Sequence, residues 1–402
     1  MKVKFALFGL LLLFPALSLL LARSSQAVPA FARREEAKCQ MCHFRLPELN
    51  EDGHSYIRRG LREEPGGMSA HAGMKMGTGA EPAGPVASTA RPLGEVLPLE
   101  WQHYLTLMGH HAYEASRGQK ARFHAGEIDG WIGGPLDPHW SGLAAVGLDI
   151  ESGEVEVEQA YGQYNTSWSP RFASVRFGQL LPFAVLFNGG GAQMPLSRPV
   201  ILDTPSRLEN PWAPTTRLRG VELGVVDLPK WNAYVGLGQP QIDELAGARH
   251  TDVYASAEYL LGEAGHAVSG FGYSGKLSGG PGQPAIEYDR IALFANLYAP
   301  RTKGVLGYLW GTDRADGESS LHTRGGFVLG EVLLTDRVSG YARYDHASKQ
   351  APVGQDVVTD GPTVGVSFWA QTQVRLTLES QFLKTTGTSR DRGAAAELMW
   401  AF

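Results

Sequence analysis

From position 97 to the last residue, the chain repeats short segments in which apolar and polar side chains alternate. Each segment has about ten residues and is bounded by Gly, Pro, Asp or Ser clusters, the pattern of β-strands separated by turns. Val221, Leu223 and Val225, for example, enclose Glu222 between apolar neighbours. Every such strand has one apolar face, and this limits the architectures available to the chain.

Two all-β architectures use strands of this kind: a soluble sandwich buries the apolar face, and a membrane barrel turns it toward lipid. The segments number about sixteen, an even number that suits a closed antiparallel barrel without exposed edges. They begin near positions 97, 121, 140, 154, 170, 216, 231, 251, 266, 284, 302, 319, 336, 363, 373 and 392. We therefore predict a mainly β fold, with an outer-membrane antiparallel β-barrel over residues 97–402.

The C-terminal segment favours the membrane barrel. Phe402, Trp400, Leu398 and Ala396 share one face of the last strand. This ending resembles the C-terminal strand by which bacterial outer-membrane barrels are recognised for insertion. The expected location is the bacterial outer membrane, with lipid as a partner.

The N-terminal segment indicates export. Two lysines precede an apolar run over residues 5–21, and small residues lead to Ala27, a pattern typical of a signal peptide over residues 1–27. An uncleaved membrane anchor is the alternative, and Pro15 within the run disfavours it. No comparably long apolar run follows, so we expect no transmembrane helix in the mature chain. The net charge of −5 gives no reason to expect a nucleic-acid partner.

Between the signal and the barrel lies the pentapeptide Cys39-Gln40-Met41-Cys42-His43, which holds the only two cysteines of the chain. Two thiols at this spacing followed by a histidine form the attachment motif of a c-type haem, with His43 as an iron ligand. The alternatives are a disulfide or half of a zinc site, and no second Cys/His pair follows for zinc. We predict one covalently bound haem c in a segment over residues 28–66.

This segment also resembles a known family. The stretch from Pro29 to Arg33, the haem motif, and Leu46-Pro47-Glu48-Leu49-Asn50 with Gly53 resemble the start of the fused monohaem cytochrome–porin family of outer-membrane electron carriers. The resemblance implies a small cytochrome that plugs the barrel. It also implies electron flow from extracellular Fe²⁺ to a periplasmic cytochrome c or copper protein, with iron:cytochrome c oxidoreductase activity as the enzymatic description.

The second axial ligand of the haem iron is open to several residues, because Met and His both ligate haem and set different potentials. We favour His54, which belongs to the part of the chain that carries the motif. The other candidates are Met68, His71, Met74, Met76, Met108 and His110. The first four lie in a Gly-, Ala-, Pro- and Met-rich linker over residues 67–96, which also allows a copper-binding interpretation.

Acidic residues are candidates for handling a cation. Glu154, Glu156 and Glu158 alternate with apolar residues and are expected to face the lumen, where carboxylates suit hard cations or a solvated wall. Asp203, Arg207 and Glu209 occupy a long segment after the fifth strand that is expected to form a constricting or surface loop.

Three functions therefore stand as hypotheses. The first is an electron conduit fed by Fe²⁺. The second is a diffusion porin for anions or small solutes with a haem-bearing plug. The third is electron export to extracellular acceptors, since the direction of flow is not encoded in the motif.

Overall fold

The computed structural model describes residues 30–35, 39–62, 104–116, 121–168, 171–190, 194–205, 212–227, 230–241, 251–262, 265–277, 285–315, 317–351, 356–387 and 393–401. The predicted signal peptide, the predicted linker over 67–96 and Phe402 lie outside these residues. Within the described residues, no helix is long and apolar enough to cross a membrane.

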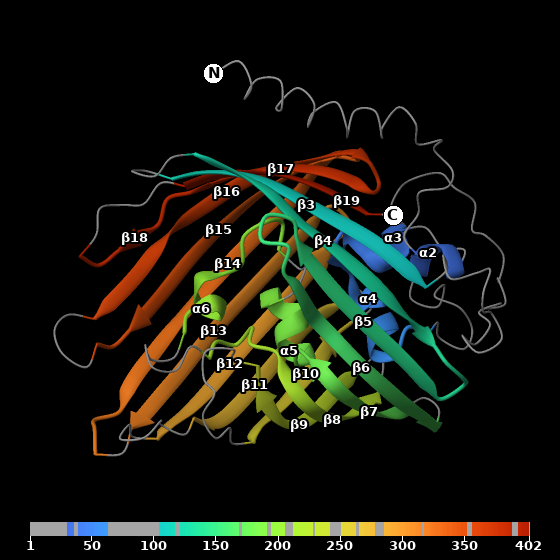
Figure 1. Cartoon of the computed structure of the whole chain (residues 1–402), viewed down its shortest axis with the longest axis horizontal. Coiled ribbons are helices and arrows are strands. Elements are labelled where there is room, and N and C mark those ends of the chain that lie inside the picture. The colour runs from blue at the N-terminus through green and yellow to red at the C-terminus, as the bar shows by residue number, and fades with distance from the viewer. Residues whose placement is uncertain are drawn as a thin grey trace.

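The strands form a closed antiparallel barrel (Figure 1). They are β3 (Leu105–Ser116), β4 (Arg122–Pro135), β5 (Trp140–Asp149), β6 (Val155–Trp168), β7 (Arg171–Leu180), β8 (Leu218–Asp227), β9 (Trp231–Pro240), β10 (Asp252–Leu261), β11 (His266–Leu277), β12 (Ile286–Ala299), β13 (Thr302–Ala315), β14 (Leu321–Thr335), β15 (Val338–Lys349), β16 (Val357–Gln371), β17 (Val374–Gln381), β18 (Lys384–Thr385) and β19 (Gly393–Ala401). From β3 to β17 each strand pairs with the next, β17 pairs with β19, and β19 pairs with β3 to close the ring. Because β18 extends β17 along β16, the described residues form a barrel of sixteen strands, as predicted.

Most strands begin within two residues of the predicted positions. The first described strand begins at Leu105, and residues 97–103 lie outside the described residues. The strand predicted from position 363 begins at Val357 instead. The error has a local cause: Asp360-Gly361-Pro362 has the composition of a turn, but the chain passes through it as a paired strand.

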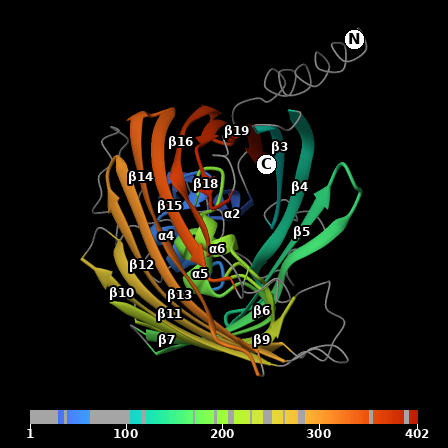
Figure 2. The same ribbon diagram turned by 90° about the vertical axis from the view of Figure 1, so that its left-hand side faces the viewer.

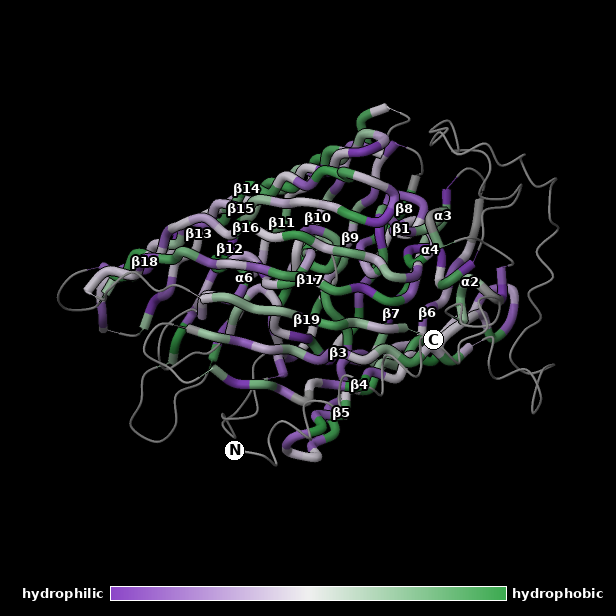
Figure 3. Tube along the Cα trace, turned by 90° about the horizontal axis from the view of Figure 1, so that it is seen from above, coloured by the Kyte–Doolittle hydropathy of each residue, from purple (hydrophilic) through white to green (hydrophobic). Residues whose placement is uncertain are grey.

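The predicted alternation is present in the barrel wall. Leu223 is 55% exposed and Ile291 is 60% exposed on the outer surface, whereas Glu222 and Arg290 are buried on the inner side. Figure 3 shows hydrophobic and hydrophilic residues alternating along the strands. An apolar outer band around a polar lumen is the arrangement of a transmembrane β-barrel.

The connections differ between the two ends of the barrel. At one end they are short, as at 136–139, 300–301, 336–337 and 372–373. At the other end they are longer, and 181–217 is the longest of them. This segment carries α5 (Phe183–Val185), which continues into a wider helical turn over Leu186–Gly190, and α6 (Val200–Asp203). Both helices lie inside the barrel (Figures 1 and 2), so the predicted loop constricts the lumen.

The N-terminal segment also lies in the lumen (Figure 2). We call residues 30–35 and 39–62 the plug. It contains α2 (Ala30–Arg34), α3 (Cys39–Cys42), β1 (His43–Arg45), β2 (Glu48–Leu49) and α4 (Glu51–Arg58).

Polar contacts join the plug to the wall at several points. Lys303 donates to Glu48 at 2.6 Å with both side chains buried, Arg58 is bonded to Glu258, and the Trp369 indole donates to the Leu46 carbonyl at 3.3 Å. The plug is therefore docked by buried charged groups as well as by apolar packing.

Candidate functional site

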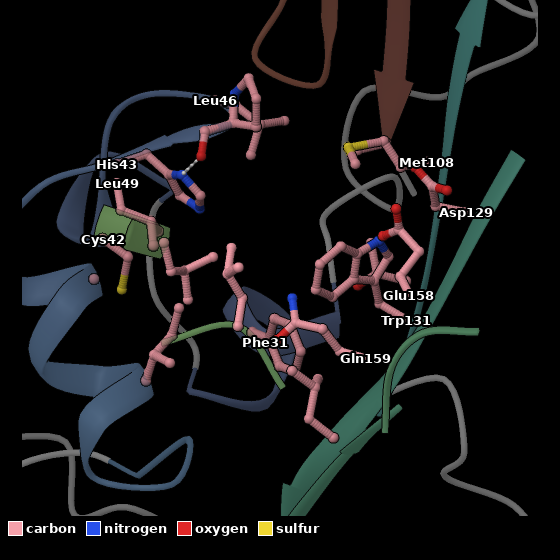
Figure 4. Close-up of a pocket in the computed structure, with 18 of the residues that line it drawn as sticks. Phe31, Cys42, His43, Leu46, Leu49, Met108, Asp129, Trp131, Glu158 and Gln159 are labelled. Atoms are coloured by element: carbon pink, nitrogen blue, oxygen red, sulfur yellow. Dashed lines mark hydrogen bonds between the residues drawn. The ribbon is translucent and has the colours of Figure 1, made fainter. Parts of the chain in front are cut away.

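A cavity of about 800 Å³ lies between the plug and the barrel wall. Cys42 and His43 occupy one side of it, and Met108, Asp129 and Glu158 occupy the other (Figure 4). The cavity therefore brings together the predicted haem motif and part of the predicted acidic wall. Its volume lies in the range of small-molecule and cofactor sites.

The local fold holds the two cysteines against the cavity. Cys39 and Cys42 fall within the single turn of α3, so both thiols belong to one rigid element. The backbone N–H of Asn50 donates to the Cys42 carbonyl at 3.0 Å, and the side-chain amide of Asn50 donates to the Met41 carbonyl at 3.1 Å. A Cβ atom on Gly53 would lie 2.1 Å from the Cys42 carbonyl oxygen. The close approach of α4 to the motif therefore requires glycine at position 53.

His43 has the hydrogen bonding of a metal ligand. Its Nδ1 lies 3.1 Å from the Pro47 carbonyl oxygen, which fixes the tautomer with the proton on Nδ1 and leaves the Nε2 lone pair available. Burial lowers the pKa of His43 to about 4, so the imidazole is neutral at pH 7. Only a neutral imidazole can donate a lone pair to a metal.

His54 lies on another face of α4. Gly53 and Ile57 line the cavity, whereas His54 stacks on Phe187 with ring centroids 4.2 Å apart. Phe187 belongs to the 181–217 connection inside the barrel, which we call the inner segment. Its Nδ1 lies 3.6 Å from Glu51 Oε2, and the side chain is 1% exposed. His54 is not among the residues that line the cavity, so its predicted role as the second axial ligand stays a prediction without geometric support.

Other candidates for this ligand do line the cavity. Met108 and His110, on β3, both face inward and contact it, as their parity predicts. Figure 4 places Met108 across the cavity from His43. Met68, His71, Met74 and Met76 lie outside the described residues.

The structure places some of the predicted acidic residues at the cavity and others away from it. Glu156 and Glu158 line the cavity and bind Arg217, which donates to Glu158 at 2.8 Å. Glu154 precedes β6 and is exposed. Asp203 is half-exposed at the end of α6 and accepts a hydrogen bond from Thr215 at 2.8 Å. Arg207 and Glu209 lie outside the described residues.

Sequence reasoning missed other cavity residues: Glu127 and Asp129, together with Trp131, on β4, and Gln159 on β6. The signal for the β4 residues was present, since they alternate with Ile128 and Gly130 in a strand that was predicted. Gln159 gave no such signal, because in a regular strand it would point to the face opposite that of Glu158.

The residues beside the cavity have the chemistry that a covalently bound haem requires. The two thiols, the neutral imidazole with a defined tautomer, and the adjoining cavity with Met108 on its far side supply the donor set that such a group needs. The arrangement fits. When bound, a haem would supply one-electron redox chemistry that the side chains lack.

Comparison with known proteins supports the barrel. No family model and no curated protein matches the chain. Solved structures do match. A loop-deletion mutant of OmpT, an outer-membrane protein of Vibrio cholerae, gives a TM-score of 0.59 at 12% identity and covers 74% of this chain and 98% of its own. An anion-selective porin from Comamonas acidovorans gives 0.59 at 13% identity, over 74% of this chain and 99% of its own. OmpF of Salmonella typhi in complex with daunomycin gives 0.57 at 12% identity, over 74% and 97%.

The fold is therefore that of bacterial outer-membrane porins, and the lipid-facing outer surface places the chain in that membrane. In such barrels the short connections face the periplasm and the longer ones face the exterior. Arg62 of the plug bonds the Asp137 and Trp140 carbonyls at the short 136–139 connection, so the plug sits toward the periplasm.

Proposed function

We propose that the protein carries a haem c on Cys39, Cys42 and His43 and passes electrons across the outer membrane through the plugged barrel. The observation that carries this proposal is the placement of the attachment motif beside an 800 Å³ cavity inside the lumen. A single redox centre can serve both sides of an apolar band roughly 25 Å tall only from within the barrel. Electron transfer weakens steeply with distance.

The packing of the lumen favours a conduit over an open pore. Plug residues Leu49 and Ile57 contact an apolar cluster that contains Phe183 and Phe187 of the inner segment and Tyr234 of the wall. A diffusion porin needs a wet lumen lined by polar groups. Apolar layers that join plug, inner segment and wall oppose a continuous water path.

The electron would enter from the long-loop side and leave at the short-connection side, where the plug lies. A periplasmic cytochrome c or copper protein is the acceptor expected there, and extracellular Fe²⁺ is the donor expected outside. The geometry also favours Met108 over His54 for the second axial position, because Met108 lines the cavity opposite His43.

The test is a paired measurement on purified protein in vesicles. Added Fe²⁺ should reduce the haem, and the same protein in a planar bilayer should show a conductance well below that of an open sixteen-strand porin. A protein without haem, or a haem that neither Fe²⁺ nor dithionite reduces, would refute the conduit.

A second function is a diffusion porin for anions or small solutes. The observation that favours it is the porin fold, which this chain shares with an anion-selective porin. High anion conductance in wild-type protein that Fe²⁺ cannot reduce would establish it. Electron export would instead appear as oxidation of dithionite-reduced haem by an external ferric acceptor.

A further inference from the structure

Three carboxylates meet on the cavity wall that faces the plug. Glu127 and Asp129 come from β4 and Glu158 from β6, and one oxygen of each lies within 4.8 Å of the others. Strand β5 runs between them and presents Gly147 at this point, paired with Asp129. A Cβ on Gly147 would lie 2.0 Å from Glu127 Oε1 and 3.2 Å from Asp129 Oδ1. The missing side chain leaves the space in which the carboxylates converge.

A β-bulge adds another oxygen to this wall. Ala145 pairs with Gln159 and Val146 pairs with Val157, so Glu158 is the extra residue of β6. As a result Glu158 and Gln159 both line the cavity, although neighbouring residues of a regular strand point to opposite faces. The bulge directs a carboxylate and an amide to the same side.

Two buried oxygens of this wall have no hydrogen-bond partner among the described residues. Asp129 is 5% exposed, and its buried Oδ1 has no hydrogen-bond partner among the described residues. Gln159 is 7% exposed, and its buried Oε1 also lacks a partner there. Buried oxygens without donors are costly, and they mark a position where a cation or water completes the bonding.

The charge balance points to a cation. Arg217 neutralises part of the charge of Glu158. Within the described part of the chain, Glu127 and Asp129 form no ion pair with Lys or Arg, and the nearest imidazole is that of His110, with Nε2 3.5 Å from Asp129 Oδ2. Three carboxylates so close together repel one another unless a cation lies between them or one of them takes up a proton.

We propose that Glu127, Asp129 and Glu158 bind a divalent transition-metal cation, with His110 as a further donor. Carboxylate oxygens with one imidazole suit Mn²⁺ and Fe²⁺ and offer no thiolate to select a softer ion. Glu158 lies in the part of β6 nearer the long-loop end, Glu127 and Asp129 lie near the middle of β4, and the plug lies at the short-connection end.

The identity of the physiological cation as Fe²⁺ rests on the proposed electron-conduit function. In that case Glu127, Asp129 and Glu158 would hold Fe²⁺ as the donor of one electron to the haem, and the Fe³⁺ product would remain at the carboxylates. No atom is transferred. The site would then be the entry point of the electron donor, on the exterior side of the redox centre.

The experiment uses Mn²⁺ as a paramagnetic probe on the full chain in detergent. Loss of the free Mn²⁺ resonance measures binding, with a single saturable site as the expected result. Asp129→Asn and Glu158→Gln should each weaken Mn²⁺ affinity by at least about tenfold, since even outer-sphere changes cost about 10- to 100-fold at metal sites. Two variants keep the test decisive if one of them does not fold.

Glu114→Gln is the matched control. Glu114 is an exposed carboxylate on β3 whose Oε2 lies 3.5 Å from His124 Nε2, the separation seen between Asp129 and His110. Its Mn²⁺ affinity should equal that of wild type. Absent binding in wild type, or equal affinity in all three variants, would overturn the cation site.

Two further measurements distinguish failure of the haem proposal from failure of the cation-site proposal. Mn²⁺ binding is repeated in Cys39→Ala/Cys42→Ala protein, where persistence is expected because no cluster residue belongs to the motif. With both cysteines intact, Asp129→Asn should slow the reduction of the haem when Fe²⁺ is the reductant at a limiting concentration. Reduction by dithionite should be unchanged. Equal slowing by both reductants would overturn the site's role as donor entry.

Discussion

Removal of the Lys303 charge should loosen the plug. Lys303 donates to Glu48 of the plug, and both side chains are 1% exposed. It also pairs across the strands with Glu331, which is buried and has two carboxylate oxygens without hydrogen-bond partners among the described residues. The Lys303 ammonium therefore bonds a plug carboxylate, and Glu331 is its cross-strand neighbour on the wall.

The size of the effect follows from the burial. Breaking a buried ion pair by removing one partner costs about 3–5 kcal/mol, because the other charge stays buried without compensation. At about 1.4 kcal/mol for each factor of ten, Lys303→Met should raise the population of the undocked plug by roughly a hundredfold to a few thousandfold.

Hydrogen exchange of plug peptides measures this population directly, because local opening exposes their amides. Exchange over residues 39–62 should accelerate by at least about a hundredfold in Lys303→Met. Lys276→Met is the matched control: Lys276 bonds Glu287 at 2.9 Å on an exposed surface, where such pairs contribute about 0–1 kcal/mol. Equal exchange in the two variants would refute the claim that this buried pair docks the plug. Adding Glu48→Gln to Lys303→Met should recover part of the loss, because the buried charge that had paired with Lys303 is then gone.

Three further outcomes test the proposed haem. Cys39→Ala with Cys42→Ala should abolish haem staining on a denaturing gel, and staining that survives would contradict covalent attachment. Met108→Ala should alter the low-spin haem spectrum and lower the haem reduction potential, since Met ligation raises that potential. His54→Ala should leave the spectrum and the potential unchanged. The reverse result would favour His54, the ligand predicted from the sequence. Gly53→Ala should reduce the haem content of folded protein, because its Cβ would lie 2.1 Å from the Cys42 carbonyl oxygen, and an unchanged haem-to-protein ratio would show that α4 can shift without cost.

The barrel could be predicted because its physical cause is local in sequence. A lipid-facing strand needs an apolar residue at every second position, and this period is visible without knowledge of partners. The prediction failed at the start of β16, where Gly361 and Pro362 have turn composition but lie in a strand. Gly and Pro indicate a turn only when pairing with neighbouring strands does not hold the segment in a sheet. That pairing is a tertiary effect, which the local sequence does not show.

The candidate site could be predicted only in part. The period of two placed Glu156 and Glu158 in the lumen correctly. It failed for Gln159, because the bulge at Glu158 reverses the parity of β6, and nothing in the local residues announces a bulge. Its position depends on register with β5, which a single strand does not encode.

The choice of His54 illustrates a different limit. A separation of eleven residues from His43 allows a return to the same metal, but a helix fixes which side chains share a face. Asn50 caps α4 through its side-chain oxygen, which accepts from the Gly53 amide at 3.0 Å. Once Gly53 faces Cys42, the adjacent His54 must face elsewhere, and in this fold it meets Phe187. The close contact of Gly53 with Cys42 is a tertiary contact, and the local sequence does not encode it.

The buried charges explain how a small plug acquires one orientation in a wide barrel. Arg58 donates to Glu51 of the plug at 2.8 Å and is bonded to Glu258 of the wall, which also accepts from Asn232 at 2.9 Å. In a rotated plug, Arg58 and Glu258 would stay buried without their ion-pair partners, at a cost on the order of several kcal/mol each. Apolar contacts alone would tolerate many orientations. The docked orientation turns Cys42 and His43 toward the cavity and its carboxylate wall. Electron transfer depends steeply on distance, so for the proposed haem this fixed docking is what would keep the transfer rate uniform from one molecule to the next.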